Sequence, residues 1–195
     1  MTTNILERLR TDTAEAHRQI ENNDYARSMM DKSMTLPQYT EYLQLFYGFL
    51  RPLEQHAISS GLPEQLGLDM DIRGKTALLE QDLLHLGVTR EQLDALPLCD
   101  SLPDISTSAR LIGSMYVIEG STLGGQIITK QLMKFLPVEP GAGISYFNGY
   151  GQDTRDQWQS FRDVVVNRGQ SPQEQQEIVD AARQTFQLLD AWFHT

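Results

Sequence analysis

Apolar side chains recur at intervals of three and four residues over most of this sequence, and that spacing limits the fold more than any other feature. The interval matches the turn of an α-helix, so the apolar side chains of each segment share one face. Only residues 144–147 show a weak strand pattern. The fold class is therefore predicted to be all-α, a compact multi-helix bundle. Helices are predicted over residues 5–20, 35–58, 75–86, 89–96, 106–136, 153–167 and 172–193.

No repeat, low-complexity segment or long linker divides the chain. A chain of 195 residues that folds as one unit buries roughly 70% of its extended-chain surface, enough for a large core with an internal ligand. Residues 1–195 are therefore predicted to form a single domain.

Acidic residues outnumber basic residues. Asp and Glu total 26 against 16 Lys and Arg, which gives a formal net charge of −10 at pH 7. Such a charge repels phosphate backbones and anionic lipid headgroups, so no nucleic acid is expected as a partner. No run of apolar residues reaches the length of a membrane span, so no membrane insertion is expected.

Two features bear on the compartment. Cys99 is the single cysteine, so no intramolecular disulfide can form. The first residues, MTTNILERLRTD, place Glu7 and Arg8 where a signal peptide needs an apolar run. A cytoplasmic location is therefore predicted.

The histidines lack the spacing of a di-iron or zinc site. A carboxylate-bridged di-iron site in a helical bundle needs glutamate three residues before histidine, and none of the four histidines has one. One cysteine and dispersed histidines also lack the ligand spacing of a zinc site.

His17 stands on the apolar stripe of the first predicted helix, beside Ile20 and one turn before Glu21. An ionisable ring in that position needs a partner. Glu21 can bond one imidazole nitrogen and leave the other pointing inward as a metal ligand. A core histidine that is satisfied by a neighbouring glutamate gives the same pattern.

The apolar helical segment over residues 111–126 contains four glycines. Each glycine costs about 1 kcal/mol relative to alanine in a helix interior. At about 100° per residue, Gly113, Gly120 and Gly124 share one face within roughly 40°. Close helix–helix packing explains such a face. A broad, flat ligand against the bare backbone also explains it, and Gly124 with Gly125 suits a helix that bends there.

An inward histidine on one helix and a glycine-lined face on another form the two sides of a haem slot. The motifs TAEAHRQIE (residues 13–21) and GSTLGGQ (residues 120–126) resemble the proximal-histidine helix and the distal helix of heme oxygenases. LEQDL (residues 79–83) and the final helix from Ala182 to Phe193 also fit. The resemblance runs in order along nearly the whole chain, and it is closest to the small bacterial enzymes.

The resemblance implies the two sides of the haem site. His17 is then the axial iron ligand and Glu21 its hydrogen-bond partner. Gly120 and Gly124 allow the distal backbone to approach the haem, and Gly125 also belongs to the haem-binding residues. The only metal expected is the haem iron.

The two haem propionates need local cations in a protein of this charge. Arg10 lies two turns before His17, and both Arg10 and Arg162 match positions where the family places propionate-binding bases. Phe186 matches a position that packs on the haem. A solvated surface position is the alternative for each arginine, and plain core packing is the alternative for Phe186.

One position departs from the mammalian pattern. Ser121 stands where mammalian members have a distal aspartate that holds a water network. A hydroxyl can still anchor water, although it carries no charge and is a weaker proton source. Tyr116, one turn before Gly120, is a second candidate anchor for water, and a buried tyrosine bonded to backbone is the alternative.

The resemblance implies cleavage of haem b by O2 to biliverdin, carbon monoxide and ferrous iron. No flavin or nicotinamide fingerprint is present, so electrons are expected from a ferredoxin, a flavodoxin or an NAD(P)H-dependent reductase. Lys130 and Lys134, with Lys75 and Arg110, are interpreted as a basic docking patch for that donor, and ordinary solvated surface lysines are the alternative. A bacteriophytochrome is the expected acceptor of biliverdin.

Two other functions compete with this interpretation. A non-catalytic haem carrier or sensor of the same fold would share the His17 and glycine features. An enzyme of the related thiaminase-like architecture would need a cysteine nucleophile, for which Cys99 is the one candidate. The loop composition around Cys99, PLCDSLP, argues against that role.

Overall fold

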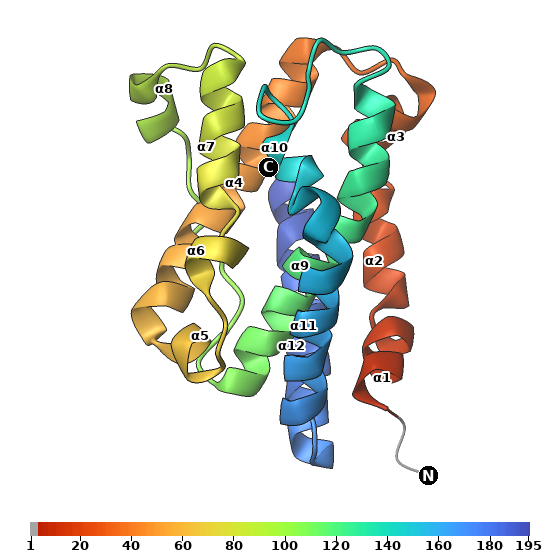
Figure 1. The fold of residues 1–195 in the computed structure, drawn as a ribbon, viewed down its shortest axis with the longest axis vertical. Coiled ribbons are helices and arrows are strands. Elements are labelled where there is room, and N and C mark those ends of the chain that lie inside the picture. Colours follow the sequence, from red (N-terminus) through yellow and green to blue (C-terminus); the bar gives the residue numbers. More distant parts are fainter. Residues whose placement is uncertain (1–3) are drawn as a thin grey trace.

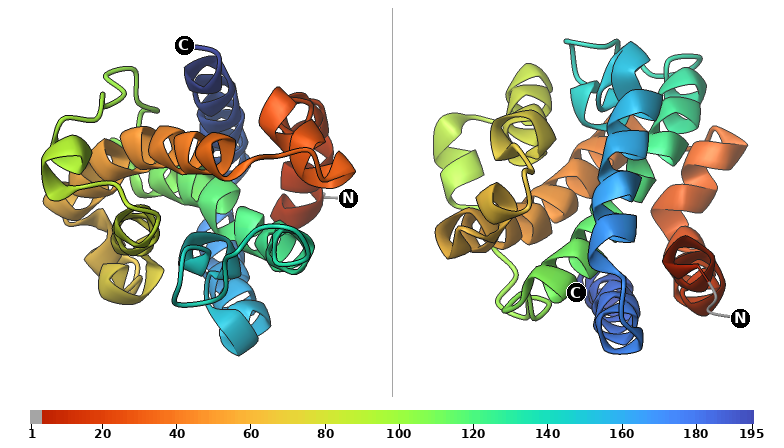
Figure 2. Two further views of the ribbon diagram at one scale, coloured as in Figure 1. Left: turned by 90° about the horizontal axis from the view of Figure 1, so that it is seen from above. Right: turned by 60° about the horizontal axis from the view of Figure 1, so that its bottom comes forward.

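Three long helices form the centre of the molecule: α4 (Leu36–Ser60), α9 (Ser108–Leu132) and α12 (Pro172–Phe193). The computed structural model describes residues 4–195, and no β-strand occurs within them. Among the described helices, α9 and α12 pack along each other most extensively. Figures 1 and 2 show α1, α2 and α3 on one side of these long helices and α5 to α8 on the other. The predicted all-α bundle is confirmed.

Side-chain caps define where the long helices begin. Thr35 and Ser171 each form a reciprocal capping box, with Gln38 and Glu174 respectively. Thr107 caps α9 by accepting a hydrogen bond from the Arg110 amide. The predicted 106–136 helix is shorter in the structure, because it begins after this cap and ends at Leu132, where the chain passes into a turn over residues 133–135.

The predicted helix over residues 5–20 is two helices, α1 (Ile5–Asp12) and α2 (Ala14–Glu21). They meet at Thr13, whose buried hydroxyl donates to the Leu9 carbonyl at 2.6 Å. A threonine that bonds a carbonyl one turn back commonly bends or interrupts a helix. The next helix, α3 (Asp24–Asp31), is capped by Asn23 and was not predicted.

The weak strand pattern at residues 144–147 is wrong, because Ser145–Asn148 form the short helix α10. Asp82 on α7 (Thr76–His85) accepts hydrogen bonds from the amides of Ser145 and Tyr146, both at 2.8 Å. These two bonds satisfy amides that a helix N-terminus leaves without partners. A buried carboxylate 63 residues away thus decides the local structure.

The longer helix α11 (Thr154–Arg168) and several short helices complete the described chain. The short ones are α5 (Leu62–Gln65), α6 (Met70–Arg73), α8 (Arg90–Asp94) and the 3₁₀ helix η1 (Gly151–Asp153). No helix within residues 4–195 is both long enough and apolar enough to cross a membrane.

We predict that Asp82→Asn lowers the free energy of unfolding by about 1–3 kcal/mol, because an amide can accept only one of the two backbone bonds. Urea unfolding measures the change. Asp31→Asn is the matched control, since exposed Asp31 also accepts a backbone bond, from Ser33. Its expected loss is below about 0.5 kcal/mol. Equal losses in the two variants would contradict the role of Asp82 in holding α10.

Candidate functional site

Helix α12 is the common support for the two helices that carry the predicted site. Both α2 and α9 pack against α12, and α3 contacts α9; Figures 1 and 2 show α2 and α3 on the same side of the long helices. His17 of α2 lies edge-on to Phe186 of α12, with ring centroids 5.5 Å apart. The structure therefore brings these two predicted site residues together. Phe186 is itself buried, so it also contributes to the core.

His17 is more exposed than the sequence pattern suggested. Helix α2 has no fully buried residue, and it contacts the core through partly buried Ala16 and Ile20. The side chain of His17 is 53% exposed and that of Glu21 is 64% exposed. Nε2 of His17 lies 3.5 Å from Oε1 of Glu21, which leaves Nδ1 as the nitrogen that does not face the carboxylate. The predicted pairing of the two residues is present, on an uncovered face.

The glycines of α9 fall into two groups with different neighbours. A Cβ atom on Gly113 would overlap the Ile178 carbonyl of α12, and one on Gly125 would overlap the Phe147 carbonyl of α10. A Cβ atom on Gly124 would meet no atom within 4 Å, and one on Gly120 would meet only Trp158, at 3.7 Å. Gly113 and Gly125 are thus explained by helix packing, whereas Gly120 and Gly124 face open space.

This division corrects two expectations. Gly113 does not share the open surroundings of Gly120 and Gly124, because α12 covers it. Gly125, predicted to bind haem, is buried against α10 instead. Only the Gly120 and Gly124 part of the stretch leaves bare backbone uncovered.

The open face of α9 is also apolar. Leu123 is 38% exposed and Ile127 is 68% exposed, and both lie within one turn of Gly124. Bare backbone flanked by uncovered apolar side chains is suited to a flat, largely apolar ligand. Together with the exposed imidazole of His17, these residues fit a haem.

Tyr116 lies close to the two predicted propionate-binding residues, Arg10 and Arg162. Burial raises the pKa of its hydroxyl, while Arg162 and Arg10 lie close enough to act in the opposite direction. The Tyr116 ring packs against Trp158 of α11 at a centroid distance of 5.6 Å. No carboxylate of residues 4–195 lies within 4 Å of the Arg10 or Arg162 guanidinium, which leaves both charges available to a ligand.

Ser121 is exposed, and its hydroxyl donates to the Ile118 carbonyl at 2.7 Å. The neighbouring Thr122 hydroxyl donates to the Glu119 carbonyl at 2.6 Å. Each hydroxyl proton is therefore used within α9. Ser121 can accept a hydrogen bond from water in this state, but it can donate one only after it releases Ile118.

The sequence analysis missed a buried polar cluster behind this face of α9. Its centre is Glu119, which is 1% exposed and bonded to Arg73, Lys75 and Tyr150. The only available signal was a glutamate within an otherwise apolar helical pattern. Trp158, the neighbour of Gly120, was likewise not singled out.

The predicted basic patch does not form as one surface. Lys75 is 1% exposed, because it is bonded inside the Glu119 cluster. Arg110 pairs with Asp104 at the first turn of α9, whereas exposed Lys130 and Lys134 lie at and beyond its last turn. Only Lys130 and Lys134 remain together.

Cys99 is buried, and burial raises the pKa of its thiol. A buried thiol with a raised pKa is a poor nucleophile. The structure thus gives no support to catalysis by Cys99.

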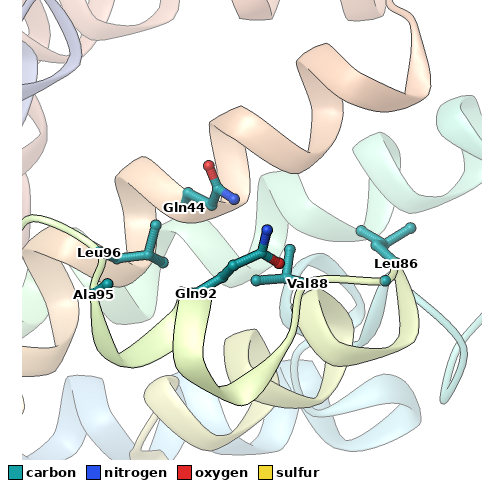
Figure 3. Close-up of a pocket in the computed structure, with 7 residues that line it drawn as sticks. Gln44, Leu86, Val88, Gln92, Ala95 and Leu96 are labelled. Atoms are coloured by element: carbon teal, nitrogen blue, oxygen red, sulfur yellow. The ribbon is translucent and has the colours of Figure 1, made fainter.

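A separate surface hollow of about 500 Å³ lies over α4, the end of α7 and α8. Figure 3 shows Gln44, Leu86, Val88, Gln92, Ala95 and Leu96 around it. None of the predicted site residues lines this hollow, so it is distinct from the His17 face.

The fold and this site define a class of all-α protein in which a histidine-bearing helix, α2, and a glycine-bearing helix, α9, both pack on one long helix, α12. The heme oxygenase family model matches residues 3–195. A heme oxygenase of Xanthomonas campestris pv. campestris (strain 8004) is 31% identical over 158 residues, covering 80% of this chain and 87% of that protein. The chain belongs to the heme oxygenase family, and it is an enzyme that degrades haem.

Solved structures agree on the fold. Heme oxygenase from Leptospira interrogans superposes with a TM-score of 0.78 at 22% identity, covering 98% of each chain. The NO- and CO-bound enzyme from Neisseria meningitidis gives a TM-score of 0.78 at 20% identity, covering 99% of this chain and 94% of that chain. Heme oxygenase-1 of Synechocystis sp. PCC6803, solved in complex with heme, gives 0.72 at 17% identity, covering 98% and 91%.

We predict opposite effects of alanine at adjacent glycines of α9. Gly124→Ala should leave the ligand-free protein as stable or raise its stability by up to about 1 kcal/mol, because alanine favours helix and meets open space. Gly125→Ala should lower stability by about 1–3 kcal/mol, because its Cβ atom meets the Phe147 carbonyl. Thermal unfolding without haem measures both.

Gly113→Ala is the control for a packed glycine, and a loss like that of Gly125→Ala is expected. The larger Gly124→Leu should abolish haem turnover while the ligand-free protein keeps the parental Tm. If Gly124→Ala destabilises as much as Gly125→Ala, the open face of α9 is a packing face and not a ligand face.

Proposed function

We propose that His17 is the axial ligand of haem b and that the haem lies against the backbone of α9 at Gly120 and Gly124. The main support is the division of the α9 glycines, since only Gly120 and Gly124 face open space. When bound, haem supplies the iron that activates O2 and the ring that is opened to biliverdin, carbon monoxide and ferrous iron. The remaining roles belong to side chains of this chain.

Glu21 orients the His17 ring. Its carboxylate lies 3.5 Å from one imidazole nitrogen, and a hydrogen bond to that nitrogen selects the tautomer with the other nitrogen free to bind iron. Phe186 stands edge-on to the same ring and limits its rotation from the α12 side. The two contacts together hold the ligand in one orientation.

Arg10 and Arg162 hold the propionates. The support for this role is that both guanidiniums lie near Tyr116 and neither is paired with a carboxylate of the described chain. Two positive charges at one end of an open apolar face suit a ligand with two carboxylates at one edge. They also fix which edge of the haem points toward Tyr116.

Ser121 and Tyr116 hydrogen-bond to the water that delivers protons on the α9 side of the haem. Tyr116 stays protonated because burial raises its pKa, so its hydroxyl is a neutral hydrogen-bond donor. Ser121 offers an acceptor to water while its proton remains on the Ile118 carbonyl. Neither group is charged, so water held here is polarised less than it would be beside an aspartate.

Electrons come from an external ferredoxin, flavodoxin or NAD(P)H-dependent reductase. The support is the absence of a flavin or nicotinamide fingerprint from the sequence and the exposed pair Lys130 and Lys134 at the end of α9. The cytoplasmic location and a bacteriophytochrome as the acceptor of biliverdin stay predictions.

We predict that His17→Ala removes the histidine-ligated Soret spectrum and stops conversion of haem to biliverdin under reductant and O2. His56→Ala is the control, because His56 is an exposed histidine on α4. Absorption spectra of the haem-loaded proteins, followed during aerobic reduction, measure both effects. If His17→Ala keeps the parental Soret band, the axial assignment is wrong.

We predict that Arg10→Ala and Arg162→Ala each weaken haem binding by about 1.5–3 kcal/mol through loss of a charge-assisted contact, or change the biliverdin isomer ratio by rotating the haem. Haem titration and chromatography of the products measure these effects. Arg155→Ala, an exposed arginine on α11, should behave like the parent. Unaltered affinity and product in both test variants would mean that other residues hold the propionates.

A further inference from the structure

Glu119 is the centre of a buried network that joins three parts of the fold to α9. Its carboxylate accepts from Nη1 of Arg73 at 2.7 Å, from the Tyr150 hydroxyl at 2.7 Å and from Nζ of Lys75 at 3.4 Å. Lys75 also donates to the Tyr150 hydroxyl, at 2.8 Å. The last residue of α6 (Arg73), the residue before α7 (Lys75) and the residue before η1 (Tyr150) are thereby attached to one carboxylate on α9.

The charges of the network balance. Arg73 and Lys75 are matched by Glu119 and by Glu54, whose carboxylate accepts from the backbone amides of Lys75 and Thr76 at 2.5 and 3.1 Å. Burying such groups costs desolvation energy, and well-packed apolar residues of similar volume often stabilise a fold at least as well. The network is therefore a weak source of stability, and it suits a requirement for one fixed arrangement of the segments that it joins.

The network reaches the face of α9 that is proposed to hold the haem. The Arg73 guanidinium lies 3.4 Å from the Ser160 hydroxyl and 5.7 Å from the centre of the Phe161 ring, both on α11. Trp158, one turn earlier on α11, is the side chain nearest to Gly120 and packs against Tyr116. Arg73 thus connects Glu119 to the helix that carries the wall beside Gly120.

We propose that Glu119 is a positioning residue: through Arg73 it fixes α9 and Trp158 relative to each other, and so determines how the haem lies over Gly120 and Gly124. Glu119 does not touch the haem in this arrangement, because its side chain is enclosed by Arg73, Lys75 and Tyr150. The part of this inference that concerns the haem rests on the proposed function. The part that concerns Trp158 does not.

The first test uses the ligand-free protein. The chain has two tryptophans, so Trp192→Phe leaves Trp158 as the single tryptophan, whose emission is followed with excitation that tyrosine does not absorb. In that background, Glu119→Gln should shift Trp158 emission to the red and increase its quenching by acrylamide. The double replacement Glu119→Leu with Arg73→Met should produce the same red shift and increased quenching with little loss of Tm. This variant separates positioning from stability. It also provides the test if Glu119→Gln folds poorly.

The second test uses the haem-loaded protein with its own tryptophans. Glu119→Gln and the double replacement should both change the ratio of biliverdin isomers released under reductant and O2. Leu93→Ala is the control, because Leu93 is buried in α8 on the far side of α7. It should lower the Tm while leaving Trp158 emission and the isomer ratio unchanged.

The outcomes separate the two proposals. Unchanged Trp158 emission in both network variants would overturn the positioning role, and so would an unchanged isomer ratio accompanied by altered emission. If the isomer ratio also changes in Leu93→Ala, loss of stability alone would account for the effect of Glu119, and the positioning role would be wrong. A parental Soret band in His17→Ala would instead contradict the proposed function and leave the Trp158 result standing.

Discussion

The position of α9 depends on two places where its backbone touches another backbone. At Gly113 it meets the Ile178 carbonyl of α12, and at Gly125 it meets the Phe147 carbonyl of α10. Any side chain at either place would push the helices apart, because a packed interior has no space for an added carbon. These contacts fix α9 at two places, and Gly120 and Gly124, which lie between them in the sequence, meet neither α12 nor α10. The open stretch of α9 therefore lies between two positions where the helix is closely packed.

The fold class and the long helices could be predicted because they depend on local information. A spacing of three and four residues, a capping serine and a stopping proline are all properties of neighbouring residues. The break at Thr13 and the helix α10 were missed for the opposite reason. One depends on a hydroxyl that bonds its own backbone, and the other depends on Asp82, which is distant in sequence.

The candidate site, too, could be predicted from the sequence only where it depends on neighbouring residues. His17, Glu21 and the glycines were found, since their types and spacing are visible in the sequence. Whether a glycine faces a helix or a ligand depends on residues far along the chain, as Gly125 and Phe147 illustrate. Lys75 was interpreted as a surface charge because its partner, Glu119, is 44 residues away. A lysine is placed in the interior by such a partner and not by its own sequence context.

The absence of buried residues on α2 has a consequence for how substrate and product are held. A helix that contributes so little to the core belongs to the least stable part of a fold, the part that opens locally without global unfolding. In the proposed site, a bond from His17 to the haem iron would direct part of the binding free energy into ordering α2. After the ring is opened and the iron leaves, that bond would no longer join the product to this helix. Under the proposed ligation, retention of haem and release of biliverdin would both depend on how firmly α2 packs on α12.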